Sequence, residues 1–278
     1  MGEQSTTEAS GRGLLVGSII RRSAQATPDA PAACVGAPDR GFATRTHAEL
    51  DREADRLAWA LRTRLGIGRG DRVVGWADTS IEVLPLFVAL SRLGAVFAPL
   101  NARLSVEEAA PIARLARPSL LIADSGRADR AGALARGAGL DRWALLSTTG
   151  TGSDPAGGVS AAEKAAWPEA SVVLDASALE DPPSPVEEPL LDERDPHVIF
   201  FTSGSTGRPK GVVLSHRANW LRGFQGVFRD EPERTVCMFP LFHMAAFTLA
   251  MAAWQTRGEI IYTDSSAEAL LGACASRR

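Results

Sequence analysis

The sequence predicts an α/β fold with mostly parallel sheets covered by helices, and two observations carry this prediction. Segments with apolar residues at helical spacing alternate with short runs of Val, Leu, Ile and Ala, a pattern typical of βαβ units. Gly or Pro closes most of these segments, which keeps the connections short. The 278 residues are enough for one large core or two modest ones.

The first half of the chain contains the clearest elements. Thr46 and Glu49 have the spacing of a capping box, in which each side chain accepts a hydrogen bond from the other residue's backbone N–H. They begin a helix that Gly66 ends. Similar signals predict further helices over 80–93, ended by Gly94, and from Ser105 and Glu108 onward, with strands over 73–76, 95–99 and 119–123.

The signals weaken between Ser125 and Pro189, where Gly, Ala, Ser and Pro dominate. Short strands are expected at 143–146 and 172–174, and the Pro-rich run 181–185 indicates a stiff exposed linker. Order returns with a strand over 195–201 that leads directly into a glycine-rich loop. We therefore expect four parts: a disordered terminus over 1–11, a first α/β subdomain over 12–190, the loop and start of a second subdomain over 191–264, and an atypical tail over 265–278.

Composition and charge exclude several classes of function. A net charge of -3 and an isoelectric point near 5.9 argue against binding to nucleic acid or to an anionic membrane surface. Three widely spaced cysteines favour buried thiols over disulfides or a zinc site, as in a reducing cytosol. The apolar run 14–20 is too short for a membrane span, so a cytoplasmic protein is expected.

The glycine-rich loop has the properties of a phosphate site. Its glycines allow close approach of backbone N–H groups to an anion, its hydroxyls add donors, and its lysine adds a mobile positive charge. The glycines and lysine do not have the Walker A spacing, which disfavours a generic nucleotide hydrolase. The expected phosphate ligands are Thr202, Ser203, Gly204, Ser205, Thr206, Gly207, Lys210 and Gly211.

The run FTSGSTGRPKGVVLSH, from Phe201 to His216, resembles the phosphate-binding signature of the adenylate-forming superfamily, to which AMP-dependent acyl-CoA synthetases belong. Residues 240–243 resemble that family's second motif, and 70–73 and 94–101 resemble its N-terminal pattern. The resemblance covers about residues 12 to 264 and implies the N-terminal portion of such an enzyme. It implies that the loop residues bind ATP and pyrophosphate, with Lys210 and Thr206 as the catalytic residues. It also implies that a carboxylic acid attacks Mg²⁺-bound ATP to give acyl-AMP, and that the thiol of coenzyme A or of a carrier protein then displaces AMP.

The resemblance also implies that Phe242 and His243 line the acyl pocket, whose apolar character favours fatty or aryl acids. No metal-ligating cluster is expected, His216 is expected to be structural, and His47 and His197 receive no chemical role. The family's adenine, ribose and lid segments have no counterpart here. Three hypotheses therefore stay open: an acyl-CoA synthetase, a non-catalytic remnant that still holds nucleotide phosphate, and half of a split enzyme. Expected partners are a homodimer mate or a complementing C-terminal chain.

Overall fold

The computed structural model describes residues 13–148, 172–202, 208–224 and 231–276. The terminus over 1–11, for which disorder was predicted, lies outside these ranges. Within them the chain folds into two sheets and the helices that cover them, so the predicted α/β class is confirmed.

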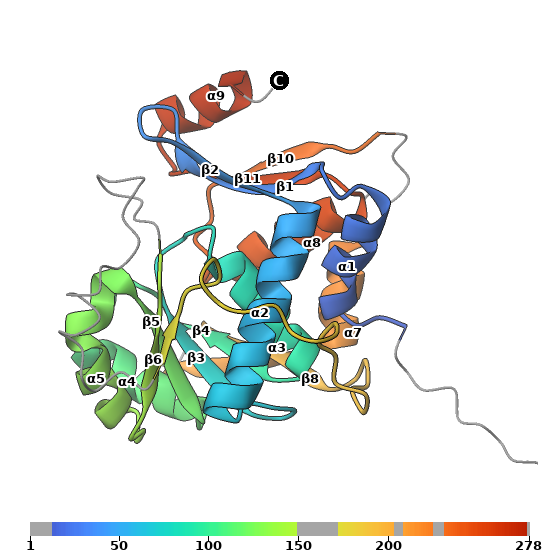
Figure 1. The fold of residues 1–278 in the computed structure, drawn as a ribbon. Coiled ribbons are helices and arrows are strands. Elements are labelled where there is room, and N and C mark those ends of the chain that lie inside the picture. Colours follow the sequence, from blue (N-terminus) through green and yellow to red (C-terminus); the bar gives the residue numbers. More distant parts are fainter. Residues whose placement is uncertain (1–12, 149–171, 203–207, 225–230, 277–278) are drawn as a thin grey trace, which may run out of the picture.

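The larger sheet has seven strands in the order β7-β6-β5-β3-β4-β8-β9 (Figure 1). All neighbouring strands are parallel except β8 and β9, which form an antiparallel hairpin at one edge. The central strands are buried on both faces, which explains why they appear in the sequence as continuous apolar runs. The strands are β3 (Arg72–Trp76), β4 (Val96–Pro99), β5 (Leu120–Asp124), β6 (Trp143–Leu146), β7 (Val172–Leu174), β8 (Pro196–Thr202) and β9 (Lys210–Ser215).

The smaller sheet joins the two ends of the chain. Its order is β10-β11-β1-β2, from β1 (Pro31–Ala37), β2 (Gly41–Thr46), β10 (Arg234–Cys237) and β11 (Glu259–Tyr262). β1 pairs in parallel with β11, with Ala33 opposite Ile260. Strands from both sides of residue 190 thus share each sheet, so the division expected there does not coincide with the division between the sheets.

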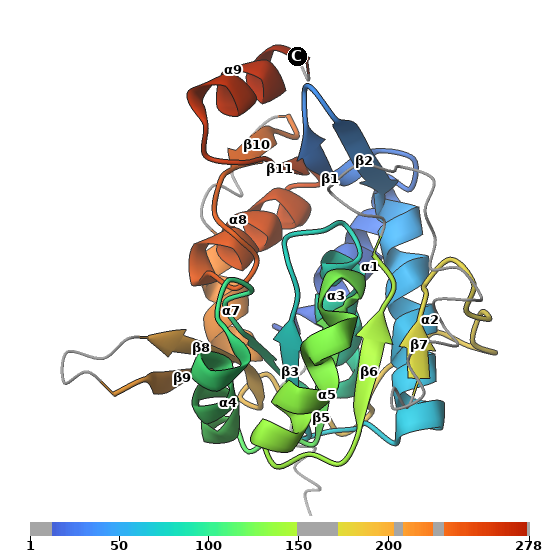
Figure 2. The ribbon, with the colours of Figure 1, turned by 90° about the vertical axis from the view of Figure 1, so that its left-hand side faces the viewer.

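The helices form layers around the two sheets (Figures 1 and 2). One set lies between the sheets and shares a single core with strands of both. This set contains α1 (Gly17–Ala26), α2 (His47–Leu65), α3 (Val83–Leu93) and α8 (Met244–Gln255), and α7 (His216–Gly223) packs beside α8. The outer face of the larger sheet is covered by α4 (Val106–Leu115) and α5 (Ala128–Gly137), which follows the short 3₁₀ helix Ser125–Arg127.

The local signals in the sequence are confirmed at the helix ends. Capping boxes form between Thr46 and Glu49 at α2 and between Ser105 and Glu108 at α4. Gly66 and Gly94 end α2 and α3 in the left-handed conformation, with φ of 65° and 66°. These devices depend only on neighbouring residues, which is why the sequence predicts them well.

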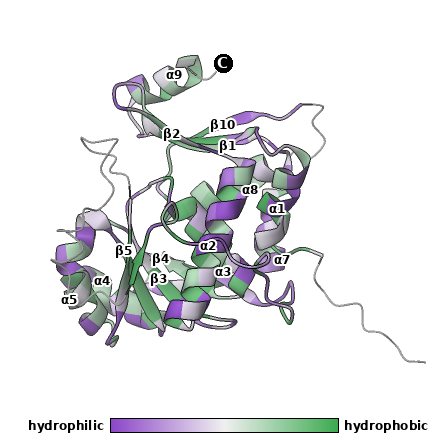
Figure 3. Cartoon of the chain, viewed as in Figure 1, coloured by the Kyte–Doolittle hydropathy of each residue, from purple (hydrophilic) through white to green (hydrophobic). Residues whose placement is uncertain are grey.

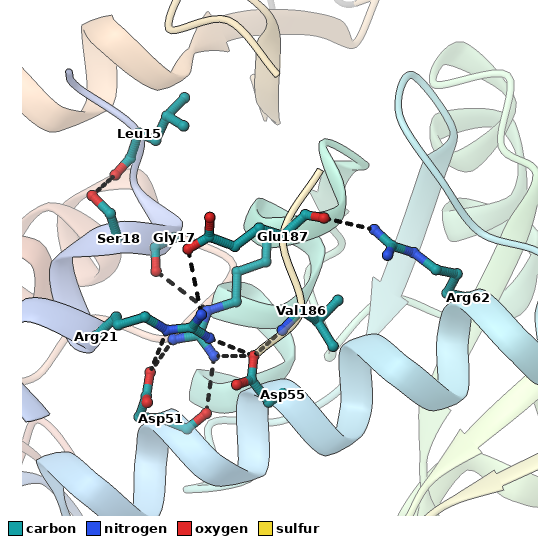
Figure 4. A network of polar contacts seen from close by, with 10 residues as sticks. Leu15, Gly17, Ser18, Arg21, Asp51, Asp55, Arg62, Val186 and Glu187 are labelled. Atoms are coloured by element: carbon teal, nitrogen blue, oxygen red, sulfur yellow. Dashed lines mark hydrogen bonds and ion pairs between the residues drawn. The ribbon is translucent and has the colours of Figure 1, made fainter. Parts of the chain in front are cut away.

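A buried network of charges fastens the middle helices together (Figure 4). Arg92 of α3 donates to Asp51 and, at 2.7 Å, to Asp55, both on α2. Arg21 of α1 reaches the same Asp55 at 2.6 Å and also binds Glu187 at 3.3 Å. The segment after the Pro-rich linker is therefore held against α1, α2 and α3 rather than being free.

The last helix covers the outer face of the smaller sheet. α9 (Ala267–Ser276) buries Ala269 and Ala273 there, and Ala273 packs with Cys34 and Ile261. Figure 3 shows the strands of both sheets with long apolar stretches, while α2 alternates between hydrophilic and hydrophobic segments. In the parts of the chain that are described, no helix is both long and apolar enough to cross a membrane.

Candidate active site

The predicted phosphate loop connects the two strands of the β8–β9 hairpin. Thr202, the last residue of β8, pairs with Lys210, the first of β9. Both residues are exposed, as is Gly211. The predicted ligands Ser203, Gly204, Ser205, Thr206 and Gly207 lie outside the described residues. The structure therefore brings together the two ends of the loop, with the lysine and one hydroxyl side by side.

Gly211 lies close to side chains of β8. It lies opposite Phe201, and a Cβ added to it would come within 3.0 Å of the Ile199 side chain and 3.7 Å of the Phe201 ring. A side chain at this position would press against the surface of β8. A larger residue here would require the Ile199 side chain to shift slightly.

The second motif lies at the start of α8. His243 is the N-cap residue of this helix and is exposed, while Phe242 is half-buried, with 5.7 Å between the two ring centroids. Leu241 is buried, and its N–H donates to the Thr79 hydroxyl at 3.1 Å, which holds the motif over the end of β3. The exposure of His243 does not fit a side chain packed into the core beside α8.

Phe242 forms one wall of a narrow apolar crevice, whereas His243 is not part of its lining. The crevice lies over the carboxyl-terminal parts of four parallel strands, and every side chain lining it is apolar. In parallel sheets of this kind, ligands bind at the carboxyl ends of the strands, near the point where the strand order reverses. Here that point is β3, because β4 lies on one side of it and β5 on the other. The strands contribute Gly75, Pro99, Ile122 and Leu146, and Val83 and Leu86 of α3 lie beside them.

Two buried histidines lie at the base of the hairpin, where the sequence suggested no chemistry. His197 of β8 and His216 of α7 have ring centroids 4.6 Å apart. Burial, with His216 nearby, lowers the pKa of His197 well below its ordinary 6.5. Burial also lowers the pKa of His216 to about 4, against an opposing effect of the Asp195 carboxylate. Both rings are therefore neutral at pH 7.

The structural role expected for His216 is visible in its contacts. Its Nδ1 accepts a hydrogen bond from the Val16 N–H at 3.3 Å, which ties α7 to the chain just before α1. His197 binds Ser91 of α3 and Asn219 of α7 at 2.6 and 2.9 Å. In the sequence, His197 and His216 flank the loop, and Asn219 follows His216 by about one helical turn. This pattern can be interpreted only once the pairing of the strands is known.

Divalent cations find no dedicated protein site in the part of the chain that the structure covers. Across the described ranges, no three His, Cys, Asp or Glu side chains are grouped so that they could hold a metal ion. The free cysteines Cys34 and Cys237 are buried apart from the loop, and Cys274 is exposed on α9.

Comparison with known proteins identifies the family. Residues 20–276 match the model of the AMP-binding enzymes, so the match extends through α9, beyond residue 264 where the resemblance was expected to end. The chain is 31% identical over 240 residues to the long-chain-fatty-acid–CoA ligase FadD13 of Mycobacterium tuberculosis, covering 84% of this chain and 42% of the relative. It is 33% identical over 254 residues to a feruloyl-CoA synthase of Amycolatopsis, covering 90% and 44%.

Solved structures show the same fold. The inhibitor-bound N-terminal domain of FACL13 from Mycobacterium tuberculosis superposes with a TM-score of 0.69 at 24% identity, covering 94% of this chain and 60% of that one. ATP-bound MatB from Rhodopseudomonas palustris gives a TM-score of 0.70 at 25% identity, covering 93% and 48%. The chain spans less than half the length of the two curated relatives. It belongs to the AMP-binding enzyme family, and its fold corresponds to the N-terminal portion of an acyl-CoA ligase.

Proposed function

We propose that this chain supplies the phosphate-gripping loop and part of the acyl site of an ATP-dependent acyl-CoA ligase. The observation that carries the proposal is the register of the β8–β9 hairpin, which places Thr202 and Lys210 together at the entrance of a family-matched glycine-rich loop. In this assignment the loop hydroxyls and backbone amides, including those of Thr206, hold the ATP phosphates. Lys210 then stabilises the charge that develops on the leaving pyrophosphate while a carboxylate attacks the α-phosphorus.

The apolar side chains around Phe242 favour a fatty or aryl acid as the substrate, since none of them would pair with an amino group. His243, exposed at the start of α8, would contact the carboxylate end of the acid. Mg²⁺ would arrive with the ATP phosphates, because the described residues offer no ligand set for it. Coenzyme A or a carrier-protein thiol would accept the acyl group.

The test is carboxylate-dependent exchange between ATP and labelled pyrophosphate, with long-chain fatty acids and hydroxycinnamic acids in the panel. Replacing Lys210 by Ala should reduce exchange about 100-fold or more, as for loss of one preorganised donor, and Lys210→Arg should recover part of it. Arg194→Ala is the matched control, because Arg194 is exposed in the turn before β8, away from the loop. Equal exchange rates in the Lys210→Ala and Arg194→Ala variants would refute the role of the lysine.

A second proposal, that the active form includes a complementing C-terminal chain, is supported by one exposed face. β9 and β10 are edge strands of the two sheets, and α7 and α8 pack between them (Figure 2). Apolar side chains are exposed at both edges: Val213 at 55% and Val212 at 45% on the two sides of β9, and Met238, directly after β10, at 44%. Exposed edges with apolar side chains favour pairing with another chain segment.

The partner proposal is tested by mixing this chain with the separately expressed remainder of an acyl-CoA ligase and measuring both mass in solution and pyrophosphate exchange. A complex that gains exchange activity supports a split enzyme. A homodimer that exchanges pyrophosphate without the added portion would show that a second copy covers the face instead. Folded protein that binds ATP but shows no exchange in any mixture would leave the non-catalytic remnant as the function.

A further inference from the structure

A continuous chain of hydrogen bonds crosses the base of the phosphate-loop hairpin. It begins on α3, passes through β8 and α7, and ends on the first turn of α8, directly after His243. We call it the hairpin relay, and its side chains are those of Ser91, His197, Asn219, Arg222 and Thr248.

The hydrogen-bond partners determine the tautomer of His197. The single hydroxyl proton of Ser91 is donated to the Phe87 carbonyl at 2.8 Å. At the 2.6 Å contact between Ser91 Oγ and His197 Nε2, the ring nitrogen must therefore be the donor. His197 Nδ1 is then left as an acceptor, and the Asn219 amide donates to it at 2.9 Å. A neutral ring with its proton on Nε2 satisfies every partner.

Arg222 sets the orientation of Asn219 and extends the relay to α8. One of its guanidinium nitrogens donates to Asn219 Oδ1 at 3.1 Å, which turns the amide nitrogen toward His197. The other donates to the hydroxyl of Thr248 on α8. Thr248 in turn donates to the Met244 carbonyl at 2.9 Å. The two nitrogens of one fork thus bridge α7 and α8.

We infer, on the basis of the proposed function, that Arg222, Asn219 and Thr248 are positioning residues that set the direction of the β8–β9 hairpin, and so of Thr202 and Lys210 at its end, relative to α8. β8 pairs with β4 at one register position, Phe97 with Val198, and its residues 198–200 are buried in the core. The hydrogen bonds of His197 at its base add to this packing in setting its direction. Thr202 lies five residues beyond His197, about 17 Å along an extended strand. A rotation of about 5° at the base would move the tip by about 1.5 Å, and an error of about 1 Å in reactant position can cost about 100-fold in rate.

The key variant is Thr248→Val, which keeps the side-chain shape but removes the acceptor that Arg222 needs. Thr248→Ser restores that acceptor and serves as the rescue. Thr63→Val is the matched control, because the Thr63 hydroxyl makes the same bond to the carbonyl four residues earlier, Trp59, at 2.7 Å, and lies on α2. Arg222→Lys is a second break in the relay, since one ammonium cannot replace the planar fork.

The first measurement is amide hydrogen exchange in the intact chain, which does not require activity. Thr248→Val and Arg222→Lys should raise exchange about fivefold in residues 198–202 and 210–213, the effect of losing one hydrogen bond, while thermal midpoints stay within about 2 °C of the Thr63→Val control. Nitrogen-15 spectra of His197 should change from a pure Nε2–H tautomer to a mixture. The inference is overturned if the relay variants show the same amide exchange in the hairpin and the same His197 tautomer as the Thr63→Val control.

The second measurement is pyrophosphate exchange, in which Thr248→Val should lower kcat about tenfold or more with little change in the KM for ATP, and Thr248→Ser should recover it. Should the wild-type chain show no exchange under any condition, the proposed function fails. The amide-exchange and tautomer results still decide whether the relay positions the hairpin. If the variants lose stability but keep the kcat of the wild type, the relay only stabilises the fold.

Discussion

Acidification should destabilise this protein through its buried histidines before most carboxylates are protonated. His216 has a pKa of about 4 in the folded chain, against an ordinary value of 6.5 in the unfolded chain. Above pH 6.5 the ring is neutral in both states and contributes nothing. Between pH 6.5 and 4 the His216 ring binds a proton in the unfolded chain but not in the folded chain, so the free energy of unfolding falls as the pH falls.

The size of the effect follows from the two pKa values. At pH 5 the linkage relation gives a loss of about 2 kcal/mol for His216 alone, and full expression below pH 4 would approach about 3.4 kcal/mol. His197 acts in the same direction because burial lowers its pKa well below the ordinary value, and so does His47, whose pKa burial also lowers. The total loss in the wild type should therefore exceed the contribution of His216.

The assay is urea unfolding followed by tryptophan fluorescence at pH 8, 7, 6 and 5. His216→Gln removes one titrating group, so its loss of stability between pH 8 and 5 should be about 2 kcal/mol smaller than that of the wild type, whatever the substitution costs at pH 8. His243→Gln is the matched control, because it makes the same substitution at an exposed histidine. A pH dependence in His216→Gln equal to that of the wild type would refute the reasoning.

Two further predictions concern the middle helical layer, and both are measured by urea unfolding at pH 7.5. Phe247→Ala should lower the free energy of unfolding by about 3–5 kcal/mol, because Phe247 is fully buried and stacks on Phe87 with 4.2 Å between the ring centroids. The control Leu115→Ala, at a half-exposed site, should lower it by under about 1 kcal/mol. Arg92→Ala should lower the free energy of unfolding by about 3–5 kcal/mol, because it leaves two carboxylates of α2 without their main buried partner. The control Arg40→Ala should lower it by about 0–1 kcal/mol, because the ion pairs of Arg40 are exposed. Equal costs within either pair would contradict the assigned packing or network.

Much of the first half of the chain was predictable because its signals are local. A capping box such as Thr46 with Glu49 stabilises a helix start through residues within one turn, and Gly66 ends the same helix because it can adopt positive φ. Strands such as β3 and β5 are buried on both faces, so they stand out as unbroken apolar runs. α1 is not among the predicted helices, although its buried residues Val16, Ile19, Ile20 and Ser23 recur at helical spacing.

The candidate site divides in the same way. The loop chemistry was predictable because its glycines, hydroxyls and Lys210 are contiguous in the chain. The place of Phe242 over a crevice at the strand ends was not, because that crevice is assembled from four strands and α3.

The sequence by itself determined the class of fold, the helix boundaries set by caps and glycines, and the phosphate-loop motif, since each depends on residues close together along the chain. Only the tertiary structure decided that residues 31–37 pair with residues 259–262 in one sheet, and that His197 lies against His216 and Asn219 beneath the loop. The physical reason is that a strand pairs with whichever edge the surrounding core brings to it, and a buried polar group needs partners that the local sequence does not supply.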